Sequence, residues 1–187
     1  MDRLPNWLTW ARLIAVPIVM VLLAIDGDDD GAAQWWALGV FFVASLTDFL
    51  DGYLARRWHV ITSFGKLADP IADKALVLGT LLMLVIYDDV PLWPLAILTI
   101  REVAVTVGRL RVASTTVIPA SRGGKIKTML QLLAIGLYLI PGTPDAVTTV
   151  AWWLLVASVV VAVVTWVDYE ARLSRARRSG HTDGAVA

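Results

Sequence analysis

Residues 147–167 read VTTVAWWLLVASVVVAVVTWV, a run of 21 residues without a charged side chain. At about 1.5 Å per residue, a helix of about 20 apolar residues crosses the hydrocarbon layer of a bilayer, which is about 30 Å thick. This run therefore predicts a membrane-spanning helix. The whole chain agrees, because 58% of its 187 residues are hydrophobic and 17% are charged, against roughly 45 to 50% and 25% in soluble domains. A soluble globular domain is excluded as the leading interpretation.

Five further stretches are apolar and long enough to support the same prediction. They lie at about 7–25, 34–54, 66–87, 92–111 and 125–140. Because isolated strands would leave unpaired backbone groups in lipid, the sequence predicts an all-α fold, a bundle of six transmembrane helices. We expect one transmembrane domain over residues 1–170. A basic and then disordered cytoplasmic tail is expected over residues 171–187, with disorder from His181 onward.

The charges alternate in sign along the chain. The first, third and fifth predicted connections contain seven acidic residues and no basic one: Asp26, Asp28, Asp29, Asp30, Asp88, Asp89 and Asp145. The other connections and both ends carry the basic residues, so the positive-inside rule predicts a multi-pass protein of the cell (plasma or inner) membrane with both termini in the cytoplasm. The net charge of zero gives no support to a nucleic-acid partner.

Four aspartates stand at the end of the second stretch and the start of the third: Asp48, Asp51, Asp69 and Asp73. With helical spacing and a short connection, they are expected to converge from two antiparallel helices at the cytoplasmic mouth of the bundle. Such carboxylates repel each other unless cations bind between them. The chain has no Cys, and its two His, His59 and His181, lie far apart in sequence; oxygen ligands alone favour magnesium or manganese.

Small residues and one arginine share the helix face of the first two aspartates. Gly52 and Ala55 leave room for a flat or bulky group to approach the backbone, and Arg56 could bind phosphate oxygens in a bidentate manner. The alternative for any one of these positions is simple close packing of helices. That alternative does not account for the regular combination of four Asp with Gly, Ala and Arg.

The segment DFLDGYLAR at 48–56, eight residues, and GKLADPIAD at 65–73 fill all eight fixed positions of the pattern D-x2-D-G-x2-A-R-x8-G-x3-D-x3-D. This segment resembles the signature of the CDP-alcohol phosphotransferases. The flanking segments at 5–12, 100–102 and 124–131 resemble those of the phosphatidylglycerophosphate synthases of this family. The resemblance covers the chain from about Asn6 to Glu170.

The resemblance implies a six-span homodimer with two divalent ions, Mg²⁺ or Mn²⁺, in a cavity open to the cytoplasm. The implied reaction joins CDP-diacylglycerol and sn-glycerol-3-phosphate into phosphatidylglycerol phosphate and releases CMP. The four aspartates match the metal ligands of the family, and Asp73 also matches its general base. The positions matching those that bind CDP-diacylglycerol are Asp51, Gly52, Ala55, Arg56 and Gly65.

The second substrate is then anionic, and several basic residues could bind it. Arg101 lies mid-span, where an unpaired cation is costly, and we expect no ion pair with Glu102 because adjacent residues point to different sides of a helix. We therefore expect Arg101, Arg109 and Lys125 to bind the phosphate of glycerol-3-phosphate. Lys127 is a weaker candidate, because ordinary positive-inside charge explains it equally well.

Other functions stay open from the sequence. Another member of the family could use inositol phosphate, serine or, in cardiolipin synthesis, phosphatidylglycerol as acceptor, because the motif describes only the shared donor. A divalent-cation transporter could use the same carboxylates, although the basic residues would repel its cargo. A structural or scaffolding membrane protein is a third alternative, and it predicts that Asp48→Asn has no effect on function or even stabilises the protein. The physiological metal, the dimer interface and the acyl-chain preference do not follow from the sequence.

Overall fold

The structure is a computed structural model that describes residues 4–27, 31–58, 63–88, 90–112 and 122–183, with side chains at 10–27, 31–47, 74–88, 90–108 and 123–171. Within these residues all regular structure is helical. The six helices are α1 (Leu4–Asp26), α2 (Ala32–Trp58), α3 (Ser63–Tyr87), α4 (Leu92–Val112), α5 (Arg122–Tyr138) and α6 (Asp145–Asp183). Each apolar stretch lies in one of these helices, except that α5 ends two residues before the predicted stretch 125–140 does, and the predicted all-α class is confirmed.

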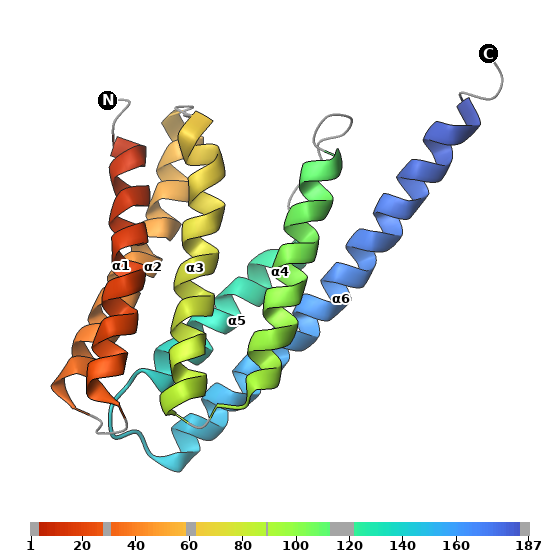
Figure 1. Ribbon diagram of the computed structural model, residues 1–187. Coiled ribbons are helices and arrows are strands. Elements are labelled where there is room, and N and C mark those ends of the chain that lie inside the picture. Colours follow the sequence, from red (N-terminus) through yellow and green to blue (C-terminus); the bar gives the residue numbers. More distant parts are fainter. Residues whose placement is uncertain (1–3, 28–30, 59–62, 89, 113–121, 184–187) are drawn as a thin grey trace.

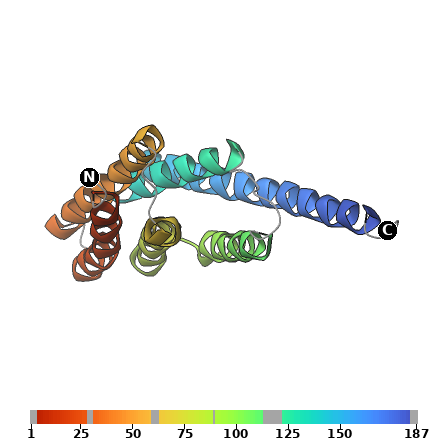
Figure 2. The same ribbon diagram turned by 90° about the horizontal axis from the view of Figure 1, so that it is seen from above.

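The helices are arranged in two layers (Figures 1 and 2). α1, α3 and α4 form one layer, and α2, α5 and α6 form the other. α1 packs against both α2 and α3, while α5 packs along α6, which also contacts α4. The contacts of α1 with α2 and of α4 with α6 are thus the most extensive ones between the two layers.

Consecutive helices run in opposite directions, so the molecule has two distinct ends (Figure 1). The connections α1–α2, α3–α4 and α5–α6 lie at one end, whereas α1 begins, α2 ends, α3 begins and α6 ends at the other. The first end carries Asp26, Asp88 and Asp145, and the second carries the basic run at 172–178. The two ends therefore differ in charge in the way that the sequence predicts.

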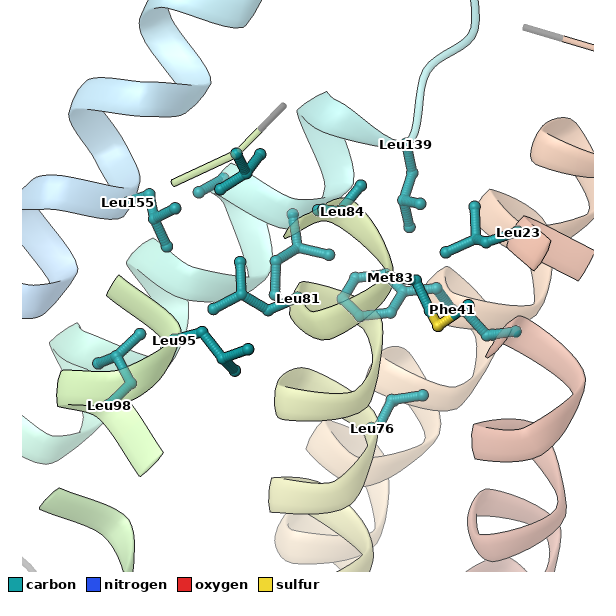
Figure 3. Close-up of a cluster of buried hydrophobic side chains, with 14 of the residues drawn as sticks. Leu23, Phe41, Leu76, Leu81, Met83, Leu84, Leu95, Leu98, Leu139 and Leu155 are labelled. Atoms are coloured by element: carbon teal, nitrogen blue, oxygen red, sulfur yellow. The ribbon is translucent and has the colours of Figure 1, made fainter. Parts of the chain in front are cut away.

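Among the side chains that the structure describes, an apolar cluster reaches the end that carries the acidic connections (Figure 3). Leu23 in the last turn of α1, Leu84 in the last turn of α3 and Leu139 directly after α5 are all buried there. Phe41 of α2 and Leu98 of α4 belong to the same cluster. In lipid, such packing stabilises a bundle through van der Waals contact rather than through exclusion of water.

The outer surface is apolar as well. Every helix exposes large apolar side chains, for example Ile14, Phe42, Ile86, Val103, Met129 and Val164. Extended apolar surface is uncommon on soluble monomers and is typical of proteins that contact lipid. By length and composition, the part of α6 at Asp145–Ala171 is the one candidate span among the described residues, and Ala32–Thr47 and Lys74–Tyr87 are shorter apolar helices.

The acidic connection after α1 contains a residue with a structural role. The carboxylate of Asp26 is buried, and it accepts hydrogen bonds from the backbone N–H of Gly31 at 3.0 Å and of Gln34 at 3.2 Å. These N–H groups lie at the start of α2, where a helix lacks its own acceptors. Gly27, with φ at 60°, lets the chain turn after α1. Asp26 therefore fixes the start of α2 relative to the end of α1, in addition to contributing negative charge to this end of the molecule.

The C-terminal part differs from the expected tail. α6 continues as a helix through the basic run to Asp183, so residues 181–183, expected to be disordered, are helical. Residues 170–178 contain no Gly or Pro and are rich in Ala, Leu and Arg, which are strong helix formers. The helix can therefore continue beyond its apolar part. Residues 184–187 lie outside the described residues.

Candidate functional site

The two halves of the aspartate motif lie on consecutive antiparallel helices. Residues 48–56 belong to the last turns of α2 and residues 65–73 to the first turns of α3. These helix ends lie at the same end of the molecule (Figure 1), and the two helices contact each other, although α3 packs more extensively on α1. The motif side chains lie outside those that the structure describes, so the metal site stays a prediction: Asp48, Asp51, Gly52, Ala55, Arg56, Gly65, Asp69 and Asp73.

A charged cluster begins at the residue after the motif. Lys74 of α3 lies with its Nζ 3.4 Å from Oε2 of Glu102 on α4 and donates a hydrogen bond to Thr106. The other oxygen of Glu102, Oε1, accepts hydrogen bonds from Nη1 of Arg101 at 2.9 Å and from Nζ of Lys127 on α5. One carboxylate thus joins cations from three helices.

The cluster is buried and carries an excess of positive charge. Arg101, Glu102 and Lys127 are 8%, 7% and 6% exposed, whereas Lys74 is about one-third exposed through its side chain. Three cations and one carboxylate give +3 − 1 = +2 for the described side chains in contact here. Removing such charge from water is costly unless an anion offsets it. The cluster is therefore suited to bind an anion.

Arg101 also retains unused hydrogen-bonding capacity. Its Nε is buried and has no hydrogen-bond partner among the described residues, and its Nη2 makes only a long contact of 3.4 Å with Oγ1 of Thr165 on α6. Unsatisfied buried donors are uncommon in folded proteins. An anion with several oxygens, such as a phosphate, could accept from these groups.

The expectation that Arg101 and Glu102 do not pair is wrong. The two side chains leave α4 about 100° apart, but both are long and bend toward each other, with Nη1 and Oε1 2.9 Å apart. Burial is the physical reason, because opposite charges attract each other more strongly away from water and an unpaired buried charge is costly. The direction in which adjacent side chains leave a helix therefore does not decide whether two long side chains form an ion pair.

The structure also distinguishes the two lysines at the start of α5. Lys127 is buried and contacts Glu102, so it is more than a topology-determining surface charge. Lys125 is exposed, and at about 100° per residue it lies on the other side of the helix. The structure therefore brings Lys127 to Arg101 rather than Lys125. The side chain of Arg109 lies outside those described.

Two members of the cluster, Lys74 and Glu102, were not among the predicted site residues. The signal that could have found them is the presence of charged residues within stretches that are otherwise apolar, where each charge needs a partner. Lys74 and Glu102 are opposite in sign and lie in neighbouring stretches. Sequence spacing alone does not show that α3, α4 and α5 meet at this point.

Close packing of α5 on α6 positions the lysine of this cluster. A Cβ atom on Gly123, one turn before Lys127, would collide with Cγ2 of Thr165. The start of α5 can therefore approach α6 only because residue 123 has no side chain. Thr165 is also the residue that Arg101 contacts, so this contact point and the charged cluster adjoin.

A second feature is an apolar groove of about 400 Å³ between α1 and α2. Its lining residues are Ala11, Arg12, Ala15, Trp36, Gly39, Val40, Val43, Ala44 and Thr47. Thr47 directly precedes Asp48 in the sequence, so the groove extends along α2 to the start of the aspartate motif. An apolar groove that leads to a polar site is suited to a lipid substrate.

Comparison with known proteins assigns the family. The family described as CDP-alcohol phosphatidyltransferase matches residues 2–164. The chain belongs to this family. The match includes the aspartate motif, the charged cluster and the groove, and it confirms the resemblance noted for residues 48–73. CDP-alcohol phosphatidyltransferases are membrane enzymes that use divalent metal ions.

Individual relatives of this CDP-alcohol phosphatidyltransferase cover most of its length. A protein of Mycobacterium tuberculosis (strain H37Rv) named "Probable phosphatidylglycerophosphate synthase" is 42% identical over 174 residues, which are 92% of this chain and 82% of the relative. A Bacillus subtilis (strain 168) protein named "CDP-diacylglycerol--glycerol-3-phosphate 3-phosphatidyltransferase" is 36% identical over 177 residues, with coverages of 87% and 92%. A Rickettsia typhi protein of the same name is 40% identical over 141 residues, with coverages of 75% and 78%.

Proposed function

We propose that this enzyme transfers the phosphatidyl group of CDP-diacylglycerol to sn-glycerol-3-phosphate, giving phosphatidylglycerol phosphate and CMP. The observation that carries the choice of acceptor is the buried cluster around Glu102, which has an excess charge of +2 beside the aspartate motif. A phosphate monoester at neutral pH carries close to two negative charges. The names of the relatives at 36% to 42% identity support the same reaction.

The donor set of the motif fits divalent metal ions. Four carboxylates on two contacting helices, in a chain without Cys, are hard oxygen ligands. We propose that Asp48, Asp51, Asp69 and Asp73 hold two ions, Mg²⁺ or Mn²⁺. When bound, such ions neutralise charge on the diphosphate and on the leaving CMP. Asp51, Gly52, Ala55, Arg56 and Gly65 hold the CDP group.

The chain's own residues carry the remaining steps. Asp73 accepts the proton of the attacking glycerol hydroxyl. A bond forms between that oxygen and the phosphorus that bears diacylglycerol, while the bond to the bridging oxygen breaks and CMP leaves with its electron pair. Arg101 and Lys127 bind the acceptor phosphate, with Arg109 and Lys125 as further candidates. Lys74 follows Asp73 directly, which supports a short path between the bound phosphate and the base.

The apolar groove between α1 and α2 supports a lipid donor. We propose that one acyl chain of CDP-diacylglycerol lies in this groove, because the groove is apolar and leads to Asp48. The headgroup of the same lipid would then lie at the motif. This placement makes the groove part of the donor site rather than a general lipid contact.

The membrane arrangement proposed here has all six helices crossing the cell membrane, with both termini and the active site in the cytoplasm. The exposed apolar side chains on every helix and the opposite charges of the two ends support it. We also propose the family's homodimer. The catalytic domain would comprise residues 1–170, with 171–187 as a basic extension.

One assay tests the reaction and its alternatives. Purified protein is supplied with CDP-diacylglycerol, magnesium or manganese, and each acceptor in turn, and lipid product and CMP are measured. We expect product with glycerol-3-phosphate. Product only with inositol phosphate would overturn the acceptor while leaving the mechanism in place. Metal uptake into vesicles that persists in Asp73→Ala, with no lipid product from the wild type, would instead support a transporter.

A further inference from the structure

Glu102 contacts three cationic side chains. Its Oε1 accepts hydrogen bonds from both Arg101 and Lys127, and its Oε2 lies 3.4 Å from Nζ of Lys74. Its side chain is 9% exposed, so water takes little part in these contacts. Glu102 itself is an anion and would repel a substrate phosphate, which means that direct phosphate binding does not explain its position.

The contacts of Glu102 also fix the positions of the cationic groups that would donate hydrogen bonds to the phosphate. Arg and Lys have long side chains that lose much rotamer freedom when they are fixed, and three cations in one buried site repel each other. A single oxygen that accepts from Arg101 and Lys127 brings their cationic groups together. Nε of Arg101 has no partner within the part of the chain that the structure describes, so the described contacts hold the cluster in place without using all its donors.

We propose that Glu102 is a positioning residue for the acceptor: it holds Arg101 and Lys127 ready for the phosphate and leaves the cluster of described side chains with an excess charge of +2. The inference rests on the proposed function, since the phosphate in question is that of glycerol-3-phosphate. With Glu102 ionised, the cluster and a phosphate dianion together are neutral. Preorganisation of this kind improves binding because less side-chain entropy is lost on association.

The variant Glu102→Gln keeps the size of the side chain and one acceptor oxygen but removes the charge. We expect the KM for glycerol-3-phosphate to rise about tenfold or more. The KM for CDP-diacylglycerol and kcat at saturating acceptor should stay within about twofold of the wild type. The control is Glu170→Gln, the same chemical change at an exposed position of α6, which should leave both KM values unchanged.

Two further measurements separate positioning from a general structural role. In a Lys127→Ala background, Glu102→Gln should raise the acceptor KM much less than it does in the wild type, because one cation that it holds is gone. Glu102→Asp keeps the charge on a shorter side chain, and its KM should lie between those of the wild type and Glu102→Gln. If Glu102→Gln yields no folded protein, the acceptor KM of Glu102→Asp tests the positioning role instead.

The outcomes distinguish the two levels of the proposal. An acceptor KM that is unchanged or lowered in Glu102→Gln or, failing that, in Glu102→Asp, with an active wild type, overturns the positioning role alone. Equal rises in the KM values for both substrates would indicate a structural residue. So would an effect of Glu102→Gln on the acceptor KM that is as large in Lys127→Ala as in the wild type. Either result would also overturn the positioning role. If the wild type makes no phosphatidylglycerol phosphate, the proposed function itself fails.

Discussion

Single residues in this enzyme act through shared partners. Arg101, Glu102 and Lys127 come from two helices and meet at one oxygen atom, so the effect of changing one of them depends on the other two. Replacing one member of a buried ionic group leaves the remaining charges uncompensated. Kinetic comparisons between matched variants are therefore more informative here than the loss of activity in any single variant.

Substitution of the proposed general base should separate chemistry from binding. In Asp73→Asn we expect turnover to fall at least about 100-fold, because the hydroxyl proton has no acceptor. Binding of Mn²⁺ and of CDP-diacylglycerol, followed by calorimetry, should persist. Asp145→Asn, at an exposed position of the opposite end, is the control for loss of a carboxylate. If Mn²⁺ binding disappears together with turnover in Asp73→Asn, Asp73 is mainly a ligand.

The two lysines of α5 provide a second comparison. Lys127→Met should raise the KM for glycerol-3-phosphate about 10- to 100-fold, since a charge-assisted hydrogen bond contributes about 1.5 to 3 kcal/mol. Lys125→Met removes the same charge from the exposed side of the helix and should have a clearly smaller effect. Steady-state kinetics with varied acceptor measure both. A larger rise in KM for Lys125→Met than for Lys127→Met would instead support Lys125 as the phosphate-binding lysine, as the sequence predicts.

At the scale of helices, the sequence predicts the positions of the helices better than it predicts the contacts between their side chains. Six apolar runs of about 20 residues identify six helices, because the length of a span and the position of charges are local properties of the chain. The contact of buried Lys127 with Glu102 and the capping of α2 by Asp26 depend on which helices meet. Those contacts are tertiary, and spacing along one helix does not contain them.

The groove between α1 and α2 can be tested by filling it. A Cβ atom on Gly39 meets nothing within 4 Å, and glycine within a helix is about 0.8 to 1 kcal/mol less favourable than alanine, to which leucine is close. Gly39→Leu should therefore fold and raise the KM for long-chain CDP-diacylglycerol several-fold, with little effect on a short-chain soluble donor. Gly136→Leu on α5, where a Cβ is equally unobstructed, is the control. Equal effects of the two variants would contradict acyl-chain binding in the groove.

For the whole molecule, the absence of cysteine in the sequence makes the topology directly accessible to experiment. Ala146→Cys at the start of α6 should react with a membrane-impermeant thiol reagent added to intact spheroplasts. Ser179→Cys near the end of α6 should react only after the membrane is permeabilised. Labelling of the two positions from the same side would contradict an odd number of crossings between them.

The length of α6 has a consequence for how its basic end operates. With 39 residues at about 1.5 Å each, the helix is about 58 Å long, nearly twice the thickness of the hydrocarbon layer. Four arginines at 172–178 are thus carried on a continuous rod whose direction is set by packing within the bundle (Figure 1). The backbone positions of these residues are therefore set by helix geometry rather than by the entropy of a random coil, at a point that lies away from the motif-bearing ends of α2 and α3 (Figure 1).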